Sequence, residues 1–148
     1  QHKLLCNLGV EPLSGEFNGD YLHALSRGRK VAIKQFIMNS HIVTGIGNIY
    51  ACEALFMAGI HPKRAASRIS KNKYELLAEV SKEVLTDAIA AGGTTLRDFV
   101  NGHGEQGYFK QELHVYGLAG EPCISCREPI RETRQGQRST FYCPVCQK

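Results

Sequence analysis

The chain has 148 residues, of which 43% are hydrophobic and 22% are charged. This length suits one ordinary domain with a small appendage, and no apolar run is long enough to span a membrane. The formal charge of +4 at pH 7 does not by itself establish a nucleic-acid partner. We therefore expect a soluble globular protein and exclude a membrane-spanning one.

The first half of the chain predicts short helices. Asp20 can cap a helix that ends near residue 28, and a second helix is expected over 30–38. A third is expected over 48–58, where Gly59 would end it in the left-handed conformation.

The longest helix is predicted over 72–91. Asn72 would cap it together with Glu75, and Gly92-Gly93 would end it. Its apolar stripe recurs at helical spacing and consists of Leu77, Val80, Val84 and Ala88. A further short helix is expected over 94–100.

From about Gln111 the apolar residues alternate instead, which is typical of short antiparallel strands. The alternating positions are Leu113, Val115, Ile130, Thr140 and Tyr142. The expected fold is therefore mainly α, with a helical domain over 1–110 and a small β zinc module over 111–148.

Two Cys-x-x-Cys pairs lie in this module, and their spacing is typical of a zinc site. The pairs are Cys123 with Cys126 and Cys143 with Cys146. Four thiolates complete a tetrahedron around one Zn²⁺, so the site is expected to be structural rather than catalytic. Two disulfides are the alternative. Cys6 and Cys52 lie far from the pairs and are expected to be small core residues.

Positive charge is concentrated in three stretches. The first holds Arg27, Arg29, Lys30 and Lys34; the second holds Lys63, Arg64, Arg68, Lys71 and Lys73; the third holds Arg127, Arg131, Arg134 and Arg138. Each stretch could equally be a solvated face, and the arginines near the thiolates could merely offset the negative metal site.

The turn over 44–48, Thr-Gly-Ile-Gly-Asn, precedes a predicted helix. Unpaired amides at a helix start, with glycines that permit close approach, suit a phosphate. Asn48 adds a side-chain donor, while Lys34 and Arg138 could reach a phosphate as cations. Taken alone, the turn is better explained by glycines that let two helices pack, and each cation could be a solvated surface residue.

Several stretches together resemble bacterial formamidopyrimidine-DNA glycosylases, in order along the whole chain. They are Val31-Ala-Ile-Lys34, Gly45-Ile-Gly-Asn-Ile-Tyr-Ala51, Gly92-Gly-Thr-Thr-Leu-Arg97, Gly107-Tyr-Phe, Glu112-Leu-His-Val-Tyr-Gly117 and Gln137-Arg-Ser-Thr-Phe-Tyr-Cys-Pro-Val-Cys-Gln147. The resemblance covers the C-terminal part of that family, a helix–two-turns–helix domain followed by a β-hairpin zinc finger.

The resemblance implies a base-excision-repair enzyme that flips oxidised purines, such as 8-oxoguanine or formamidopyrimidines, out of damaged double-stranded DNA. It would remove the base and cleave the strand as an AP lyase. Asn48, Lys34 and Arg138 would hold phosphates around the lesion, and Arg29 and Tyr116 would be further DNA contacts. Arg138 also matches the family's proposed proton donor in δ-elimination. Arginine is a poor acid, so we favour the phosphate role for it.

The resemblance also implies a loop that closes over the everted base, from residue 94 to 107. Its candidate contacts are Thr94, Leu96, Arg97, Asp98 and Phe99.

The family's catalytic residues are an N-terminal proline followed by a glutamate, with a lysine further along an N-terminal β-sandwich. This sequence begins at Gln1 without an initiator Met and contains none of that domain. We therefore expect a fragment that binds DNA but is inactive alone. It would be monomeric, cytoplasmic and nucleoid-associated.

Two other functions remain open at this point. One is a stand-alone zinc-ribbon module for RNA or a protein partner. The other is an endonuclease VIII-type glycosylase for oxidised pyrimidines, although the stretches over 112–117 and 137–143 favour the purine enzyme.

Overall fold

The structure is a computed structural model that describes residues 8–90 and 113–148. Within these ranges it holds four α-helices, a short 3₁₀ helix and a two-stranded antiparallel hairpin. The helices are α2 (Gly19–Ser26), α3 (Ile33–Met38), α4 (Asn48–Ala58) and α5 (Lys71–Ala90), with η1 at Ala66–Arg68; the strands are β1 (Arg131–Gln135) and β2 (Arg138–Tyr142). The mainly α fold with a terminal β-hairpin is confirmed.

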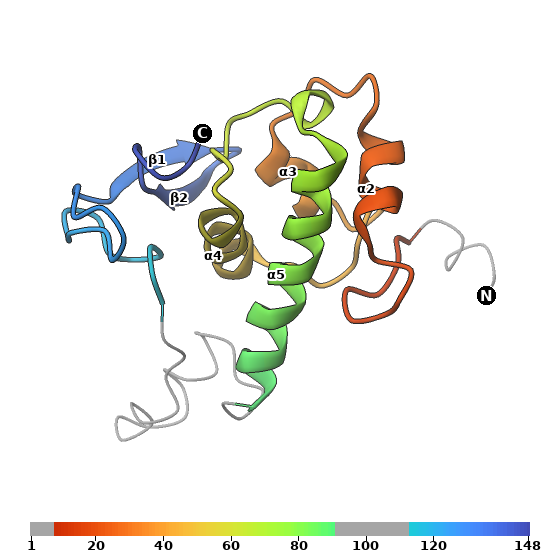
Figure 1. The fold of residues 1–148 in the computed structure, drawn as a ribbon, viewed down its shortest axis with the longest axis horizontal. Helices are drawn as coiled ribbons and strands as arrows, with labels where there is room; N and C mark the ends of the chain where they lie inside the picture. Colours follow the sequence, from red (N-terminus) through yellow and green to blue (C-terminus); the bar gives the residue numbers. More distant parts are fainter. Residues whose placement is uncertain (1–7, 91–112) are drawn as a thin grey trace.

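Helix α4 lies between the hairpin and the other helices (Figure 1). It packs against α5 and α3 on one side and against β2 on the other. The expected division between residues 110 and 111 falls outside the described residues.

The cap of α2 is Asn18, whose side chain accepts a hydrogen bond from the Tyr21 amide. The prediction that Asp20 caps this helix is wrong, because Asp20 lies in the first turn and pairs with Lys71 instead, at 2.8 Å. Gly19 allows α2 to approach α5 closely: a Cβ at this position would lie 2.7 Å from the backbone of Glu75.

Helix α3 begins at Ile33, three residues later than the sequence predicts. The backbone before it is extended, and Ala32 forms an antiparallel bridge with Ala65. The Ala66 amide donates to the Val31 carbonyl, so the residues preceding Ile33 are held by the segment around η1 rather than by a helical turn.

The predicted bounds of α4 are confirmed. Gly59 follows the helix with φ of 72°, and its amide donates to the carbonyls of Leu55 and Phe56. A residue with a side chain is strained in this left-handed conformation, so Gly59 gives the helix a defined end.

Helix α5 begins at Lys71, and the residue before it provides the cap. The Lys73 amide donates to the Ser70 hydroxyl at 3.2 Å. The predicted pairing of Asn72 with Glu75 as a cap is therefore wrong. The predicted apolar stripe is confirmed, because all four of its residues are buried. The stop at Gly92-Gly93 and the helix over 94–100 lie outside the described residues.

The hairpin pairs Arg131 with Tyr142 and Gln135 with Arg138. Both residues of its turn, Gly136 and Gln137, have positive φ, which matches the twist of the strands. The prediction of a strand at Leu113 and Val115 is wrong for the described residues. This segment is irregular and turned, although Val115 is fully buried.

Two apolar cores stabilise the described parts. The larger lies among the helices, and the smaller is formed by Cys52 of α4 with Val115, Ile130 and Phe141 of the C-terminal segment. The smaller core therefore joins the zinc module, residues 113–148, to α4. No helix among the described residues is both long and apolar enough to cross a membrane.

Candidate nucleic-acid interface and metal centre

The four predicted cysteine ligands converge in the zinc module. Their Sγ atoms all lie within 4.8 Å of one another. The separations are 3.8 Å between Cys123 and Cys146 and 3.4 Å between Cys126 and Cys143. A tetrahedron with Zn–S bonds of about 2.3 Å has edges of about 3.8 Å, so the cluster has the size of a Zn²⁺ site.

The thiols do not ionise equally without a cation. Burial opposes ionisation of Cys123, but hydrogen bonds from the Cys126 and Ser125 amides and from neighbouring thiols outweigh it and lower its pKa to about 7. Burial, followed by hydrogen bonds with the other thiols, raises the pKa of Cys146 to about 12. Four adjacent thiolates are thus incompatible without a compensating dication, which is the chemistry a zinc ion supplies.

The zinc module is tied to the helical part by Gln147, which is 1% exposed. Its Nε2 donates to the Ile60 carbonyl at 2.9 Å, and its Oε1 accepts from the Cys143 amide at 2.8 Å. A ligand of the metal is therefore linked to the segment that follows the end of α4. Cys52, also on α4, is 1% exposed, as expected of a core residue, whereas Cys6 lies outside the described residues.

Asn48 is the first residue of α4 and faces the hairpin. Its Nδ2 donates to the Ser139 carbonyl at 2.9 Å. Its Oδ1 is buried and has no hydrogen-bond partner in the described structure. As an acceptor, this oxygen would be satisfied by a donor such as a water molecule and not by a phosphate oxygen.

Lys34 reaches the same strand from α3. Its Nζ donates to the Thr140 hydroxyl at 2.6 Å and lies 3.5 Å from the Ser139 carbonyl. The side chain is 1% exposed. Burial lowers the pKa of Lys34; Cys52 opposes this shift, and the positive charge of Arg138 adds to it.

Lys34 and Arg138 line one cavity of about 190 Å³ between α3 and the hairpin turn. Its other lining residues are Gln35, Met38, Asn39, Gln135 and Gly136. No carboxylate lines this cavity, so an anion placed there would relieve the repulsion between the two cations. We refer to Lys34, Asn48 and Arg138, for which the family resemblance implies contacts with phosphates, together as the phosphate clamp.

The remaining predicted contacts among the described residues do not line this cavity. Arg29 is exposed, and its guanidinium carbon lies 5.9 Å from the centre of the Phe36 ring. The Tyr116 ring packs edge-on against Phe141 at 4.8 Å. Neither residue lines the cavity between Lys34 and Arg138. The predicted base-pocket contacts over 94–99 lie outside the described residues.

Sequence reasoning missed several residues that hold the clamp. Ser139 and Thr140 receive both helical side chains, and Gln135 donates to the Pro62 carbonyl at 2.9 Å. The Lys34 amide donates to the same carbonyl at 3.2 Å. Pro62 therefore links the hairpin turn directly to α3.

Glu53 was also missed, although it is an acidic residue in an otherwise apolar helix. Its side chain is 2% exposed, and its carboxylate accepts from the amides of His114, Val115 and Tyr116, at 2.8 to 2.9 Å. These bonds fix the beginning of the zinc module on α4. A lone carboxylate within an apolar stripe could have indicated such an anchor.

Comparisons with known proteins match both parts of the chain. Residues 8–100 match the family described as the formamidopyrimidine-DNA glycosylase H2TH domain. Residues 120–148 match a zinc finger found in FPG and IleRS. A formamidopyrimidine-DNA glycosylase of Alcanivorax borkumensis is 60% identical over 99% of this chain, and one of Marinobacter nauticus is 57% identical over 100% of it. The chain spans 55% of the length of each.

Solved structures give the same result. A Lactococcus lactis formamidopyrimidine-DNA glycosylase, non-covalently bound to DNA containing an AP site, superimposes with a TM-score of 0.83 and 30% identity. The match covers 99% of this chain and 53% of that one. The MutM (Fpg) protein of Thermus thermophilus gives a TM-score of 0.81 and 32% identity, covering 98% of this chain and 55% of that one.

Proposed function

Because the chain belongs to the formamidopyrimidine-DNA glycosylase family, we propose that it is the DNA-binding portion of an enzyme that repairs oxidised purines. It binds the backbone of damaged duplex DNA through phosphates and holds a structural Zn²⁺ on Cys123, Cys126, Cys143 and Cys146. The helical unit ends near residue 110.

One observation carries this proposal. Lys34, Asn48 and Arg138 come from distant parts of the sequence and meet at one short strand, where two of them line a cavity without a carboxylate. Arg138 supplies a planar fork for phosphate oxygens, and Asn48 supplies an amide at a helix start. Lys34 is tied to Thr140, so it positions the strand and adds positive charge.

The whole protein would remove 8-oxoguanine and formamidopyrimidines and then cleave the strand. The 148 residues alone would bind without catalysis, because they do not include the proline–glutamate pair that the family resemblance assigns to the chemistry. Arg29 and Tyr116 would be outer contacts, and the segment around Thr94 to Phe99 would contact the everted base. The protein would act as a monomer in the bacterial cytoplasm, on nucleoid DNA.

Fluorescence anisotropy with a duplex containing an abasic-site analogue tests the binding. The logarithm of the association constant should fall with the logarithm of salt concentration, with a slope of about −0.9 per neutralised phosphate. A flat salt response, or a preference for RNA, would reject the proposal.

Borohydride trapping tests the absence of catalysis. The 148-residue chain, incubated with a duplex containing 8-oxoguanine, should give neither a covalent adduct nor a nicked strand. Either product would show that these residues contain a working nucleophile.

A further inference from the structure

The phosphate clamp leaves the second basic stretch of the sequence unexplained. No acidic residue occurs between residues 54 and 74, while five cations do: Lys63, Arg64, Arg68, Lys71 and Lys73. Among the described residues, Lys71 has an acidic partner, Asp20. No ion pair with an acidic residue is formed by the other four within the described part of the chain.

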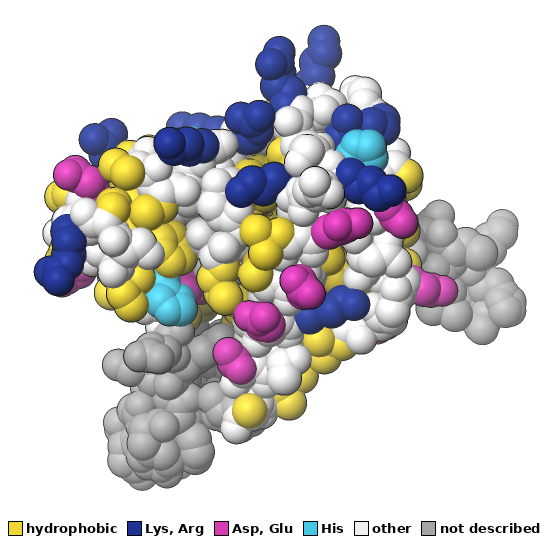
Figure 2. Space-filling view, viewed as in Figure 1, with side chains coloured by type: hydrophobic (Ala, Val, Ile, Leu, Met, Phe, Trp, Pro, Cys, Tyr) yellow, Lys and Arg dark blue, Asp and Glu magenta, His cyan; other side chains and the backbone are white. Residues whose placement is uncertain are grey.

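Three of these cations line a cavity of about 390 Å³. Arg64, Arg68 and Lys73 share it with Lys148, and no carboxylate side chain lines it. We call it the basic cavity. In Figure 2, Lys and Arg side chains gather along the upper edge, whereas several acidic side chains lie lower, over the part of the molecule that α5 occupies, and others lie at the left and right.

The contacts inside the basic cavity compensate its positive charge in part, and the zinc ligand Cys146 also lines it. Lys73 donates to the Ala58 carbonyl at 3.0 Å, and Arg64 donates to the carbonyls of Arg68 and Lys148 at 3.3 and 3.5 Å. The Ala58 and Arg68 oxygens are neutral carbonyls, whereas the Lys148 oxygen belongs to the terminal carboxylate of the 148-residue chain and offsets one positive charge. The guanidinium of Arg68 has no hydrogen bond to the described residues, so its fork is available to an external anion.

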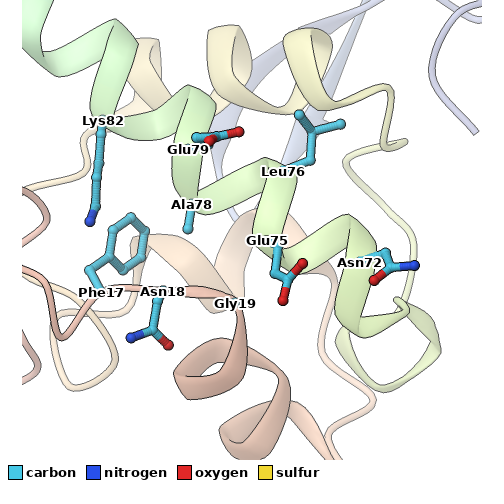
Figure 3. A pocket seen from close by; sticks show the side chains of 9 residues that line it. All are labelled: Phe17, Asn18, Gly19, Asn72, Glu75, Leu76, Ala78, Glu79 and Lys82. Carbon is cyan, nitrogen blue, oxygen red and sulfur yellow. The ribbon is translucent and has the colours of Figure 1, made fainter.

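A second hollow shows that volume alone does not define such a site. The groove between α2 and α5, of about 520 Å³, is lined by Glu75, Glu79 and Lys82 among others (Figure 3). Its one lysine already donates to the Ser14 carbonyl at 2.9 Å. This groove carries both signs of charge and offers no unoccupied cation to an anion.

The basic cavity is separate from the phosphate clamp. Asn48 begins α4 and Gly59, which lines the basic cavity, follows its end. A helix of this length is about 16 Å long, so one phosphate cannot occupy both places.

We propose that the basic cavity is a second phosphate-binding site, which takes a phosphodiester group while the clamp holds another. This inference rests on the proposed DNA binding for its source of phosphate, which is either a flanking turn of the same duplex or a second duplex.

Inorganic phosphate is the first probe. In heteronuclear NMR spectra of the 148-residue chain, phosphate should shift the Gly59 amide and the Arg68 guanidinium signals, and Arg68→Gln should abolish the Gly59 shift. The absence of a saturable shift at Gly59 would overturn the proposal, whatever the behaviour toward DNA.

Duplex DNA is the second probe, with a variant that combines Arg68→Gln and Lys148→Gln. Its salt slope should be smaller than that of the wild type by about 1 to 2, and its affinity for a long duplex should fall about tenfold. Lys71→Gln is the matched control, since it removes a cation from the same stretch that is already paired. The variant removes two charges and the control removes one, so a loss per removed charge that is as large in the control as in the variant would reduce the effect to net charge and reject the site.

Duplex length separates the two sources of phosphate. A flanking turn predicts that the variant loses affinity for a long duplex but not for a short one. A second duplex predicts that the wild type binds two short duplexes per chain. If the wild type binds no duplex but Gly59 still responds to phosphate, the proposed DNA function fails and the phosphate site stands.

Discussion

At the scale of residues, the clamp depends on side chains that meet across a long stretch of sequence. Asn48 and Lys34 both reach residues 139–140, and Arg138 is adjacent to them in the chain. The hydrogen-bonding groups of the helical part therefore fix the strand from which the exposed Arg138 side chain extends.

Asn48→Ala should weaken binding to abasic and undamaged duplexes to a similar extent, by about five- to tenfold. A phosphate contact positions the protein without reading the base. Fluorescence anisotropy with both duplexes measures the loss of affinity. Arg138→Ala should also weaken binding to both duplexes to a similar extent. A loss confined to the abasic duplex would contradict the phosphate role.

Glu53→Gln should lower the free energy of unfolding by about 2–4 kcal/mol. The two oxygens of the carboxylate accept hydrogen bonds from three backbone amides, whereas the side chain of glutamine has a single acceptor oxygen and no charge. Urea unfolding measures the change. Glu79→Gln, at an exposed position of α5, is the control and should change stability by less than about 0.5 kcal/mol.

Zinc binding near neutral pH should release at least two protons, those of Cys126 and Cys146, whose pKa values are raised above the ordinary thiol value. Below about pH 7 the Cys123 thiol is protonated as well, so at least three protons are released and the apparent zinc affinity should fall by about 1,000-fold or more for each further unit of pH. Competition with a chromophoric chelator measures it. Cys52→Ala should show the same pH dependence, because Cys52 is not a ligand.

At the scale of elements, the ends of the helices were harder to predict than their existence. The apolar stripe of α5 follows from periodicity alone, whereas the predicted cap, Asn72, is wrong. The structure favours Ser70, because the Lys73 amide lies within hydrogen-bond distance of its hydroxyl.

Ser70→Ala should destabilise the chain by about 1 kcal/mol, because it removes the acceptor for an unpaired amide in the first turn of α5. Thermal unfolding measures the difference. Asn72 is the second residue of α5, so Asn72→Ala should leave the stability of the chain nearly unchanged. If Asn72→Ala destabilises the chain more than Ser70→Ala does, the cap is Asn72, as the sequence predicts.

At the scale of the whole molecule, two apolar cores of different kinds are joined through α4. The helical core is extensive, whereas the smaller core contains two of the metal ligands, Cys123 and Cys143. The zinc module is therefore expected to lose its order before the helices do.

Removal of zinc by a chelator should disorder the hairpin and weaken DNA binding, while most of the helical circular dichroism signal remains. The reason is that the ligands stabilise the module through the ion, which contributes roughly 10–16 kcal/mol in comparable zinc-finger peptides. Loss of the whole helical signal would show that both cores unfold together.

The sequence by itself determined the zinc ligands, the bounds of α4 and the buried stripe of α5. These features rest on local spacing: two Cys-x-x-Cys pairs, a glycine at a helix end and a 3.6-residue period. Local spacing also explains the errors, because Asp20 and Asn72 are acceptable caps that neighbouring residues replaced.

The tertiary structure alone decided which side chains meet. Ser139 and Thr140 receive Lys34 and Asn48, Glu53 holds the start of the zinc module, and Arg68 and Lys148 share a cavity. These contacts join residues separated by tens of positions or more. They depend on the packing of the hairpin against α4, which no local pattern specifies.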